Sequence, residues 1–411
     1  MKSSSRLYNI SRVGIIGAAP HRFLDVLSNE NIEKFNLYYF SNEKVTYETL
    51  VRLVEKYMPE KKEKLIGFEL PWPDAYNSII NEILKSKSNG DSVTISEVFS
   101  NFPNVFYKFI NEHMACTDIL WVGDNDFDSS FIFATLLNAL GIRYVLSLKE
   151  TRFVPSMFEL EALKNAKFVI LPHEQYIDFF KKKYSIDLSR KAVFADIDWR
   201  SKVAYEILKD SKVQKLSARD GKFHVAILSG RVVWNKEESR SQGRYYYVPI
   251  IEDLLNAGFI VHLHTKALLE SLDNPVYYEP NPYTRLLLKF PNSFIIEKPI
   301  DLNDIENYKL LMKYDLGLLN SGVSGKDEFN EFEKINVPNR FYEYLHANVI
   351  PICPKGTLQY MEKKFAGDVL FFENARELRA LLQSVKPQNC KPKYFFDDFV
   401  KTLVDASEKF Y

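Results

Sequence analysis

The stretch from Ile335 to Gly356 combines the start of a helix with polar side chains that could bind an anion. Its sequence is INVPNRFYEYLHANVIPICPKG, in which a proline precedes an amphipathic segment and an apolar run follows it. Pro338 suits the first turn of a helix, where its missing N–H would have no partner anyway. The free N–H groups of that turn, with Asn339 and Arg340 beside them, could receive a negatively charged group.

A carboxylate lies one turn further along the same predicted helix. Glu343 follows Arg340 by three residues and could accept hydrogen bonds from two neighbouring hydroxyl groups, as a ribose offers them. A phosphate at the helix end and a ribose one turn away together describe a nucleoside diphosphate. The alternative is an ordinary amphipathic helix in which Arg340 and Glu343 pair with each other. The spacing alone does not decide between the two.

A second candidate is the stretch LSGRVVWNKEES, which follows a predicted strand. Gly230 allows the backbone to turn sharply, and Arg231 and Lys236 then place two cations in the loop beyond that strand. Two cations would stabilise the charge that develops on a departing diphosphate. Taken alone, the segment is more typical of a solvated loop of mixed charge.

A third candidate is the acidic stretch GDNDFD, which also follows a predicted strand. Asp124 and Asp126 form a D-x-D pair, which can hold a divalent metal between two phosphates. We favour the alternative, a polar loop that caps the helix beginning near Ser129. His21 and His173 each follow a strand as well. No histidine pair has the spacing of metal ligands, so we predict no metal site.

The elements that must position these residues alternate along the chain as in a parallel, doubly wound sheet. Strands are predicted within residues 12–20, 35–41, 117–126, 143–148, 167–173, 191–198, 223–230, 259–265, 293–298, 315–321 and 349–354, with helices between them. The polar stretch 209–222 lacks apolar periodicity and is typical of a linker. We predict an N-terminal Rossmann-like domain over 1–208, a linker over 209–222, a second Rossmann-like domain over 223–390, and a C-terminal helix over 391–411 that packs back toward the first domain.

Taken together, the segments resemble GT-B glycosyltransferases, in particular the large retaining group (family 4, group 1 type) that includes many cell-envelope glycan enzymes. VPNRFYEYLHANVIPI is similar to that group's P-N-K-L-x-E-Y-L-A-x-G-x-P-V-I segment, and SGRVVWNK to its G-R-x-x-x-x-K loop. The resemblance covers roughly residues 220–385 well and 117–200 loosely. Residues 40–115 show no such match.

The resemblance implies two Rossmann-like domains facing across a cleft and a function in polysaccharide biosynthesis. A hexosyltransferase-type enzyme would move a sugar from a nucleoside-diphosphate sugar to the hydroxyl of a glycan or lipid-linked acceptor, with retention of configuration. It would need neither a metal nor a cofactor besides the donor substrate. Arg231 and Lys236 would be the catalytic cations on the diphosphate. The backbone around Asn339 and Arg340 would meet the phosphates, and Glu343 would bind the ribose.

The remaining roles implied by the resemblance concern the base and the acceptor. Pro299, in the loop from Lys298 to Ile300, would flank the base. Gly17, after the first strand, would border the acceptor. Asp124 and Asp126 would face the acceptor side, where they could bind its hydroxyl groups.

The sequence departs from the family pattern at three positions of the donor segment. Ile335 stands where the family often carries a glutamate, although Glu331 and Glu333 are nearby. Asn348 replaces a glycine but tolerates a left-handed backbone. Arg340 replaces a lysine, which keeps the charge and changes its shape.

Two other functions are compatible with these residues. A nucleotide-sugar epimerase on the same fold would use acids and a histidine, for which His21, His173 and the Asp124 loop are candidates. A catalytically silent subunit would bind a nucleotide or a partner glycosyltransferase.

The composition excludes some partners and favours a compartment. Among the 411 residues, 54 Lys and Arg balance 54 Asp and Glu, so the formal net charge is zero and no nucleic-acid partner is predicted. Three scattered cysteines favour a reducing setting. No apolar run approaches the roughly 18–20 residues that span a bilayer. We expect a cytoplasmic protein and leave open a peripheral contact with the cytoplasmic face of a membrane.

Overall fold

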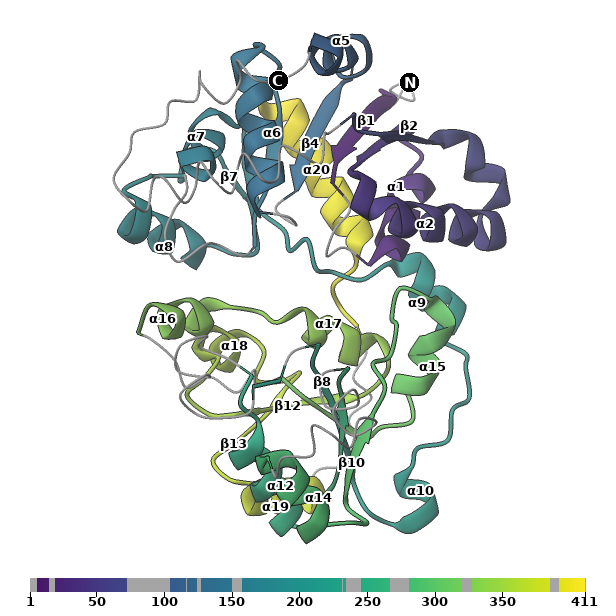
Figure 1. The fold of residues 1–411 in the computed structure, drawn as a ribbon, viewed down its shortest axis with the longest axis vertical. Coiled ribbons are helices and arrows are strands. Elements are labelled where there is room, and N and C mark those ends of the chain that lie inside the picture. The colour runs from purple at the N-terminus through teal and green to yellow at the C-terminus, as the bar shows by residue number, and fades with distance from the viewer. Residues whose placement is uncertain are drawn as a thin grey trace, which may run out of the picture. The chain divides into compact units, whose positions relative to one another are not determined.

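The computed structural model describes eleven stretches of the chain, and two compact units can be distinguished in it (Figure 1). The described residues are 6–14, 19–71, 104–115, 117–123, 127–149, 157–230, 232–233, 245–266, 281–319, 327–384 and 392–410. The first unit comprises Met1–Ile197 and Phe396–Tyr411, and the second comprises Asp198–Phe395. The domain limits predicted from the sequence stay a prediction.

The first unit is built on a seven-stranded sheet in the order β3-β2-β1-β4-β5-β6-β7, in which neighbouring strands pair in parallel. Its strands are β1 (Tyr8–Val13), β2 (Ile32–Tyr39), β3 (Leu65–Glu69), β4 (Ile119–Gly123), β5 (Val145–Ser147), β6 (Val169–Leu171) and β7 (Ala192–Phe194). All five residues of the apolar strand β4 are buried. The strand order reverses between β1 and β4, so the carboxyl ends of these two strands mark the usual ligand position of such sheets.

Helices join the strands of the first unit. They are α1 (Phe23–Ser28), α2 (Lys44–Tyr57), α5 (Asn104–His113), α6 (Phe127–Ala139), α7 (Met157–Asn165) and α8 (Gln175–Tyr184), together with three short 3-10 helices at Pro20–Arg22, Ser41–Glu43 and Pro59–Lys64. The last helix of the chain, α20 (Phe396–Phe410), also belongs to this unit. Its Phe399 ring packs on Trp121 of β4 with centroids 5.1 Å apart, so its apolar face covers this sheet.

The second unit contains a six-stranded parallel sheet in the order β10-β9-β8-β11-β12-β13, again doubly wound. Its strands are β8 (His224–Leu228), β9 (Ile260–His264), β10 (Phe294–Glu297), β11 (Leu316–Leu318), β12 (Ile350–Pro354) and β13 (Leu370–Phe372). Its helices are α9 (Lys202–Leu208), α10 (Ser217–Asp220), α12 (Val248–Asn256), α14 (Pro282–Lys289), α15 (Tyr308–Leu311), α16 (Asp327–Ile335), α17 (Asn339–His346), α18 (Gln359–Lys364) and α19 (Ala375–Ser384), with a 3-10 turn at Ile305–Asn307.

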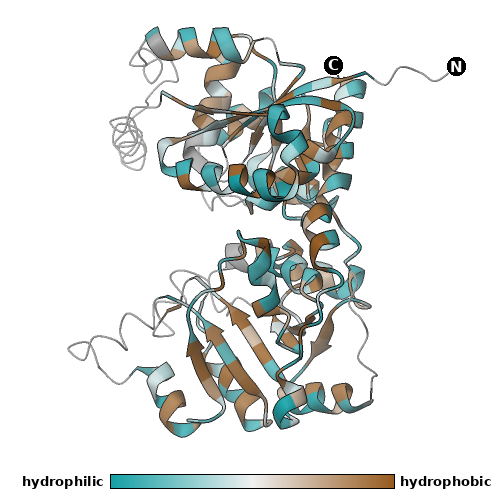
Figure 2. Cartoon of the chain, turned by 90° about the vertical axis from the view of Figure 1, so that its right-hand side faces the viewer, coloured by the Kyte–Doolittle hydropathy of each residue, from teal (hydrophilic) through white to brown (hydrophobic). Residues whose placement is uncertain are grey.

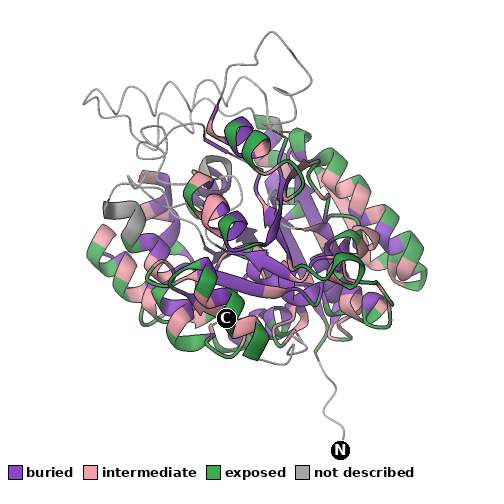
Figure 3. Ribbon diagram, turned by 90° about the horizontal axis from the view of Figure 1, so that it is seen from below, coloured by how far each residue is buried: buried purple, intermediate pink, exposed green. Residues whose placement is uncertain are grey.

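The two faces of this second sheet differ in chemistry. Val225, Val261 and Leu263 pack with α12, α14 and α19 in one apolar cluster. Because side chains alternate along a strand, the other face receives His224, Ala226, His262 and His264. The strands are mainly hydrophobic in Figure 2 and buried in Figure 3, while exposed residues gather on the helices. Within the described residues, no helix is both long and apolar enough to cross a bilayer.

The fold class predicted from the sequence is confirmed, with differences at single elements. The strand predicted from Arg12 onward spans Tyr8–Val13 instead, and it ends at Gly14, whose backbone is left-handed with φ 83°. Residues 15–18 lie outside the described residues. Helix α2 and strand β3 were not predicted. Helix α10 lies within the polar stretch 209–222, in which Lys215 donates from Nζ to the carbonyl oxygens of Tyr314 and Asn348.

The contact between Gly317 of β11 and Tyr344 of α17 yields a test of how tightly this helix is packed. A Cβ on Gly317 would lie 2.5 Å from the ring of Tyr344, which is fully buried and has its hydroxyl group between two carbonyl oxygens. We expect Gly317→Ala to lower the free energy of unfolding by about 1–3 kcal/mol, measured by urea denaturation. Gly367→Ala is the matched control because no atom lies within 4 Å of its added Cβ. Equal stability of both variants would contradict the packing described.

Candidate functional site

Helix α17 begins directly after Pro338, as the sequence predicts. Pro338 has φ −59° and ψ 139°, and its carbonyl oxygen accepts a hydrogen bond from the N–H of Phe341 at 2.9 Å. The first two N–H groups of the helix therefore belong to Asn339 and Arg340. The side chain of Asn339 is exposed. An anion could approach the helix at this end, where the backbone dipoles favour negative charge.

The other side of α17 is anchored on the sheet. The hydroxyl group of Tyr344 lies 3.2 Å from the carbonyl oxygen of Ala226 in β8 and 3.3 Å from that of Leu318 in β11. The absence of a side chain at Gly317 leaves room for the tyrosine ring. The helix therefore crosses the central strands in a fixed position.

Arg340 connects the start of α17 with the segment that follows β8. Its Nη1 lies 3.5 Å from the hydroxyl oxygen of Tyr247, and that hydroxyl donates to Oγ of Ser229 at 3.0 Å. Ser229 and Gly230 come directly after β8, and an added Cβ on Gly230 would meet no atom within 4 Å. The structure thus brings together the two segments that the sequence singled out, at the carboxyl edge of the sheet.

Glu343 forms its ion pair with a residue that the sequence did not indicate. Its Oε1 accepts a hydrogen bond from Nη2 of Arg200 at 2.7 Å, and the side chains of Arg200 and Glu343 are 1% and 15% exposed. Within the described ranges, Oε2 makes no hydrogen bond. The pairing of Arg340 with Glu343 that the sequence left open is therefore replaced by Arg200 as the ion-pair partner. One carboxylate oxygen is anchored, and the other can accept a ligand hydroxyl.

Burial and ion pairing act in opposite directions on Arg200. Burial lowers the pKa of its guanidinium group, but the neighbouring Glu343, Tyr308 and Asp198, with Glu343 acting most strongly, together outweigh this and hold the pKa above its usual value. Nη1 of Arg200 also donates to the carbonyl oxygen of Asp198 at 2.7 Å. Arg200 is therefore a fixed cation that orients Glu343.

Aromatic side chains close around the same helix. Trp199 stacks on Tyr394 with ring centroids 5.9 Å apart, and Tyr394 meets Tyr342 of α17 edge-on at 6.2 Å. Near the end of α17, Nε2 of His346 lies 3.0 Å from the carbonyl oxygen of Ser201. Burial lowers the pKa of His346 to about 3, so the ring is neutral at physiological pH.

Pro299 is exposed two residues after the end of β10, at the same edge of the sheet as Ser229. Nδ1 of His264 lies 2.8 Å from the carbonyl oxygen of Lys298, which fixes the backbone of this loop. Strand β10 is two positions away from β8 in the sheet, or about 10 Å. That separation matches the distance from the base to the phosphates of a nucleotide.

Five of the predicted site residues lie outside the described residues, so their placement stays a prediction. They are Arg231, Lys236, Gly17, Asp124 and Asp126.

Asn348 and Ile335, at which the sequence departs from the family pattern, both lie in described parts of the chain. Asn348 has the left-handed backbone predicted for it, with φ 50°. Ile335 ends α16, and Glu333, two residues earlier, is buried with Oε2 3.5 Å from Nδ2 of Asn336. Glu331 is exposed beside Lys334.

Three ionisable side chains follow neighbouring strands of the first unit, and only His173 among them was singled out from the sequence. Lys149, His173 and Asp196 each stand two residues beyond the end of β5, β6 and β7, and all three are buried. Nζ of Lys149 lies 2.9 Å from Oδ2 of Asp196. The same offset after adjacent strands was the sequence signal for this pair. His21 is buried as well.

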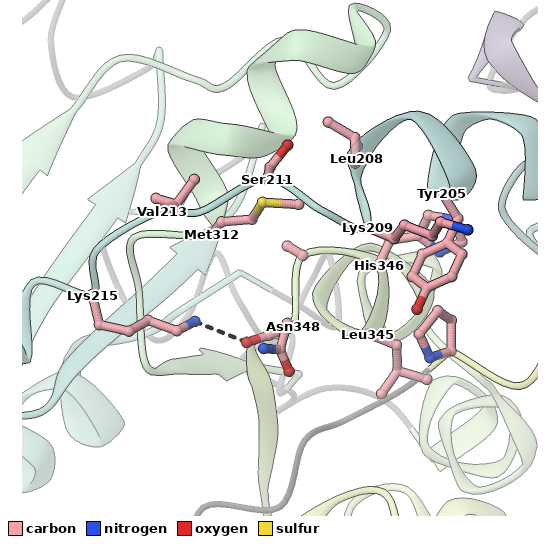
Figure 4. Close-up of a pocket in the computed structure, with 12 residues that line it drawn as sticks. Tyr205, Leu208, Lys209, Ser211, Val213, Lys215, Met312, Leu345, His346 and Asn348 are labelled. Carbon is pink, nitrogen blue, oxygen red and sulfur yellow. Dashed lines mark hydrogen bonds between the residues drawn. The ribbon is translucent and has the colours of Figure 1, made fainter.

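A cavity of about 240 Å³ lies at the C-terminal end of α17 (Figure 4). Its lining includes Tyr205, Leu208, Met312, Leu345 and Asn348, and the hydrogen bond from Lys215 to the carbonyl oxygen of Asn348 borders it. Because Arg340 belongs to the opposite end of the helix, this cavity is separate from the predicted nucleotide site.

Among the described side chains, no group of three or more His, Cys, Asp or Glu could hold a metal.

No known family model and no curated protein sequence matches this chain, but solved structures share its fold. HepE (Alr3699) of Anabaena, crystallised in complex with UDP, aligns with a TM-score of 0.53 over 98% of this chain and 98% of its own, at 10% identity. The UDP-GlcNAc 2-epimerase of Methanocaldococcus jannaschii aligns with a TM-score of 0.51 over 97% and 99%, at 12% identity.

A third structure, WaaG, is a glycosyltransferase involved in lipopolysaccharide biosynthesis. It covers 97% of this chain and 95% of its own at 8% identity, with a TM-score of 0.41 that carries no weight. The first two likenesses concern the fold alone. They establish the GT-B type, with two parallel-sheet α/β units.

The Arg200–Glu343 pair can be tested by removing one partner at a time. We expect Glu343→Ala to lower the free energy of unfolding by about 3–5 kcal/mol, because it leaves the Arg200 cation buried without its carboxylate. The matched control is Glu252→Ala, which breaks the exposed pair with Lys289 and should change stability by less than about 1 kcal/mol. Urea denaturation measures both. The double variant Arg200→Met, Glu343→Leu should recover most of the loss, and failure to do so would contradict this account.

The buried imidazole of His346 predicts a dependence of stability on pH. Its folded pKa of about 3 lies below the ordinary 6.5, so between these values the unfolded chain binds a proton that the folded chain does not. Stability is therefore retained above pH 6.5 and lost as the pH falls toward 3, by up to about 1.4 kcal/mol per pH unit. Urea midpoints should fall less steeply with pH for His346→Gln than for the unmodified chain. The control for the loss of a histidine is His113→Gln, at an exposed site.

Proposed function

We propose that the chain is a glycosyltransferase that moves a sugar from a nucleoside-diphosphate sugar to the hydroxyl of a glycan or lipid-linked acceptor. The observation that carries this proposal is the joining of two segments at one sheet edge. Arg340 at the start of α17 reaches Tyr247, whose hydroxyl group donates to Ser229 beyond β8, and Glu343 on the same helix presents a carboxylate fixed by Arg200. The helix end at Arg340, which could bind a phosphate, and the Glu343 carboxylate, which could accept hydrogen bonds from a ribose, therefore lie one helical turn apart.

In this proposal each part of the donor has a partner in the second unit. The diphosphate meets the first N–H groups of α17 and the side chains of Arg231 and Lys236. The ribose hydroxyl groups donate to the unbonded oxygen of Glu343, and the base lies against Pro299. The two cations stabilise the charge that builds on the departing diphosphate. The leaving phosphate then helps to remove the acceptor proton, which gives transfer with retention and without a metal.

An epimerase acting on a nucleotide sugar is the second candidate. One observation in the first unit favours an epimerase. Buried ionisable groups follow the strands of its sheet, namely His21, His173, Lys149 and Asp196. Such an enzyme would isomerise the nucleotide sugar in the absence of any acceptor, which nuclear magnetic resonance of the sugar would detect. A transferase needs the acceptor, and a silent subunit would leave the nucleotide sugar unchanged in both assays.

A thermal-shift screen against UDP-, GDP-, ADP- and CMP-sugars tests the proposed donor site. A nucleotide sugar that binds only the folded chain should stabilise it by about 2.7 kcal/mol at one hundred times its Kd. Arg231→Ala and Lys236→Ala should remove most of this stabilisation together with turnover. Lys289→Ala removes an exposed cation of the same unit and should leave the stabilisation intact. If none of the nucleotide sugars raises the melting temperature, the proposed donor site is wrong.

A further inference from the structure

A chain of close polar contacts between side chains crosses the polar face of the second sheet. His262 of β9 lies between two partners, with Nε2 2.8 Å from Nδ1 of His224 and Nδ1 2.5 Å from Oε1 of Glu297. The same Glu297 oxygen lies 3.4 Å from the hydroxyl group of Tyr314, which in turn lies 2.9 Å from Nε2 of His264. The chain ends at the carbonyl oxygen of Lys298, 2.8 Å from Nδ1 of His264.

The positions of the protons along this chain follow from what each group can donate. A carboxylate only accepts, so Nδ1 of His262 carries a proton and donates it to Glu297. A carbonyl oxygen also only accepts, so Nδ1 of His264 carries a proton and donates it to the carbonyl oxygen of Lys298. In the neutral ring the other nitrogen, Nε2, carries no proton and faces the hydroxyl group of Tyr314 at 2.9 Å.

The charges around the chain are consistent with a neutral His264. Burial lowers the pKa of this ring, against the opposing effects of the Lys298 carbonyl and Glu297. At the far end of the chain, Asp220 of α10 lies 3.1 Å from Nε2 of His224, and Asp315 accepts the main-chain N–H of His224 at 2.9 Å. All of these groups belong to described residues of one unit, on α10, β8, β9, β10 and the turn before β11.

We propose that His264 is a positioning residue for the nucleotide base: its Nδ1–H donates to the Lys298 carbonyl and thereby holds the backbone of the Lys298–Ile300 segment. This inference rests on the proposed function, because the base is what the segment contacts there. His264 itself does not touch the base. Its effect passes through the main chain, so it acts on base affinity and leaves the diphosphate site unchanged.

Two substitutions of similar size separate the two ring nitrogens. The amide nitrogen of Asn occupies the place of Nδ1, so His264→Asn keeps a donor toward Lys298, while the longer Gln places its amide near Nε2. By isothermal titration, we expect His264→Gln to weaken UDP binding roughly three- to tenfold, the range of one lost hydrogen bond, and His264→Asn to keep most of the affinity. Inorganic pyrophosphate, which lacks a base, should bind both variants as it binds the unmodified chain. His113→Asn is the control in the first unit.

The outcomes distinguish the inference from the function on which it rests. If His264→Gln binds UDP as tightly as the unmodified chain, or loses UDP and pyrophosphate to the same extent, His264 does not position the base. If the unmodified chain binds pyrophosphate but neither UDP nor another nucleoside diphosphate, the base contact fails with the proposed donor. Nitrogen-15 resonances of the ligand-free chain read the tautomer independently. A proton on Nε2 of His264 instead of Nδ1 would overturn the inference whatever the nucleotide result.

Discussion

The ion pair between Arg200 and Glu343 is the constraint on which the geometry of the second unit's candidate site depends. A guanidinium group that is 1% exposed would be strongly unfavourable alone, and the carboxylate on α17 offsets that cost. The pair therefore ties the segment 198–201 to α17, and the contacts of His346 with Ser201 and of Trp199 with Tyr394 reinforce the same connection. Because Arg200 fixes Glu343 while Tyr344 fixes the helix on the sheet, the start of α17 is held in both position and rotation.

This arrangement explains how one helix serves both structure and binding. Its anchored residues, Tyr344 and His346, are buried and neutral, so they cost no charge desolvation. Its polar residues lie near the N-terminus, where Arg340 reaches the segment beyond β8. The backbone dipoles add positive charge at that same end. The helix is thus rigid along the side that faces the sheet and open where an anion can approach.

The fold could be predicted from the sequence because it depends on local patterns. Apolar runs such as Ile119–Gly123 are long enough to be recognised as strands, and Pro338 marks the start of α17. β1 was misplaced because Asn9, Ser11 and Arg12 interrupt its apolar pattern. The site was predicted only where its residues are close in sequence. Arg200 lies 143 positions before Glu343, and nothing around it in the sequence indicates the partner that the fold supplies.

The two faces of the second sheet make different contributions. The apolar face mainly stabilises the fold, and the polar face fixes the orientation of side chains and loops. One face is packed with apolar side chains from α12, α14 and α19, and its favourable energy follows from burial and has little direction. The other face holds His224, His262, His264 and Tyr314, whose hydrogen bonds are directional and fix orientation. A substitution in the apolar cluster therefore acts mainly on folding. A substitution in the polar chain acts on the hydrogen bond that holds the Lys298 carbonyl, so it affects the loop after β10 more than the packing of the core.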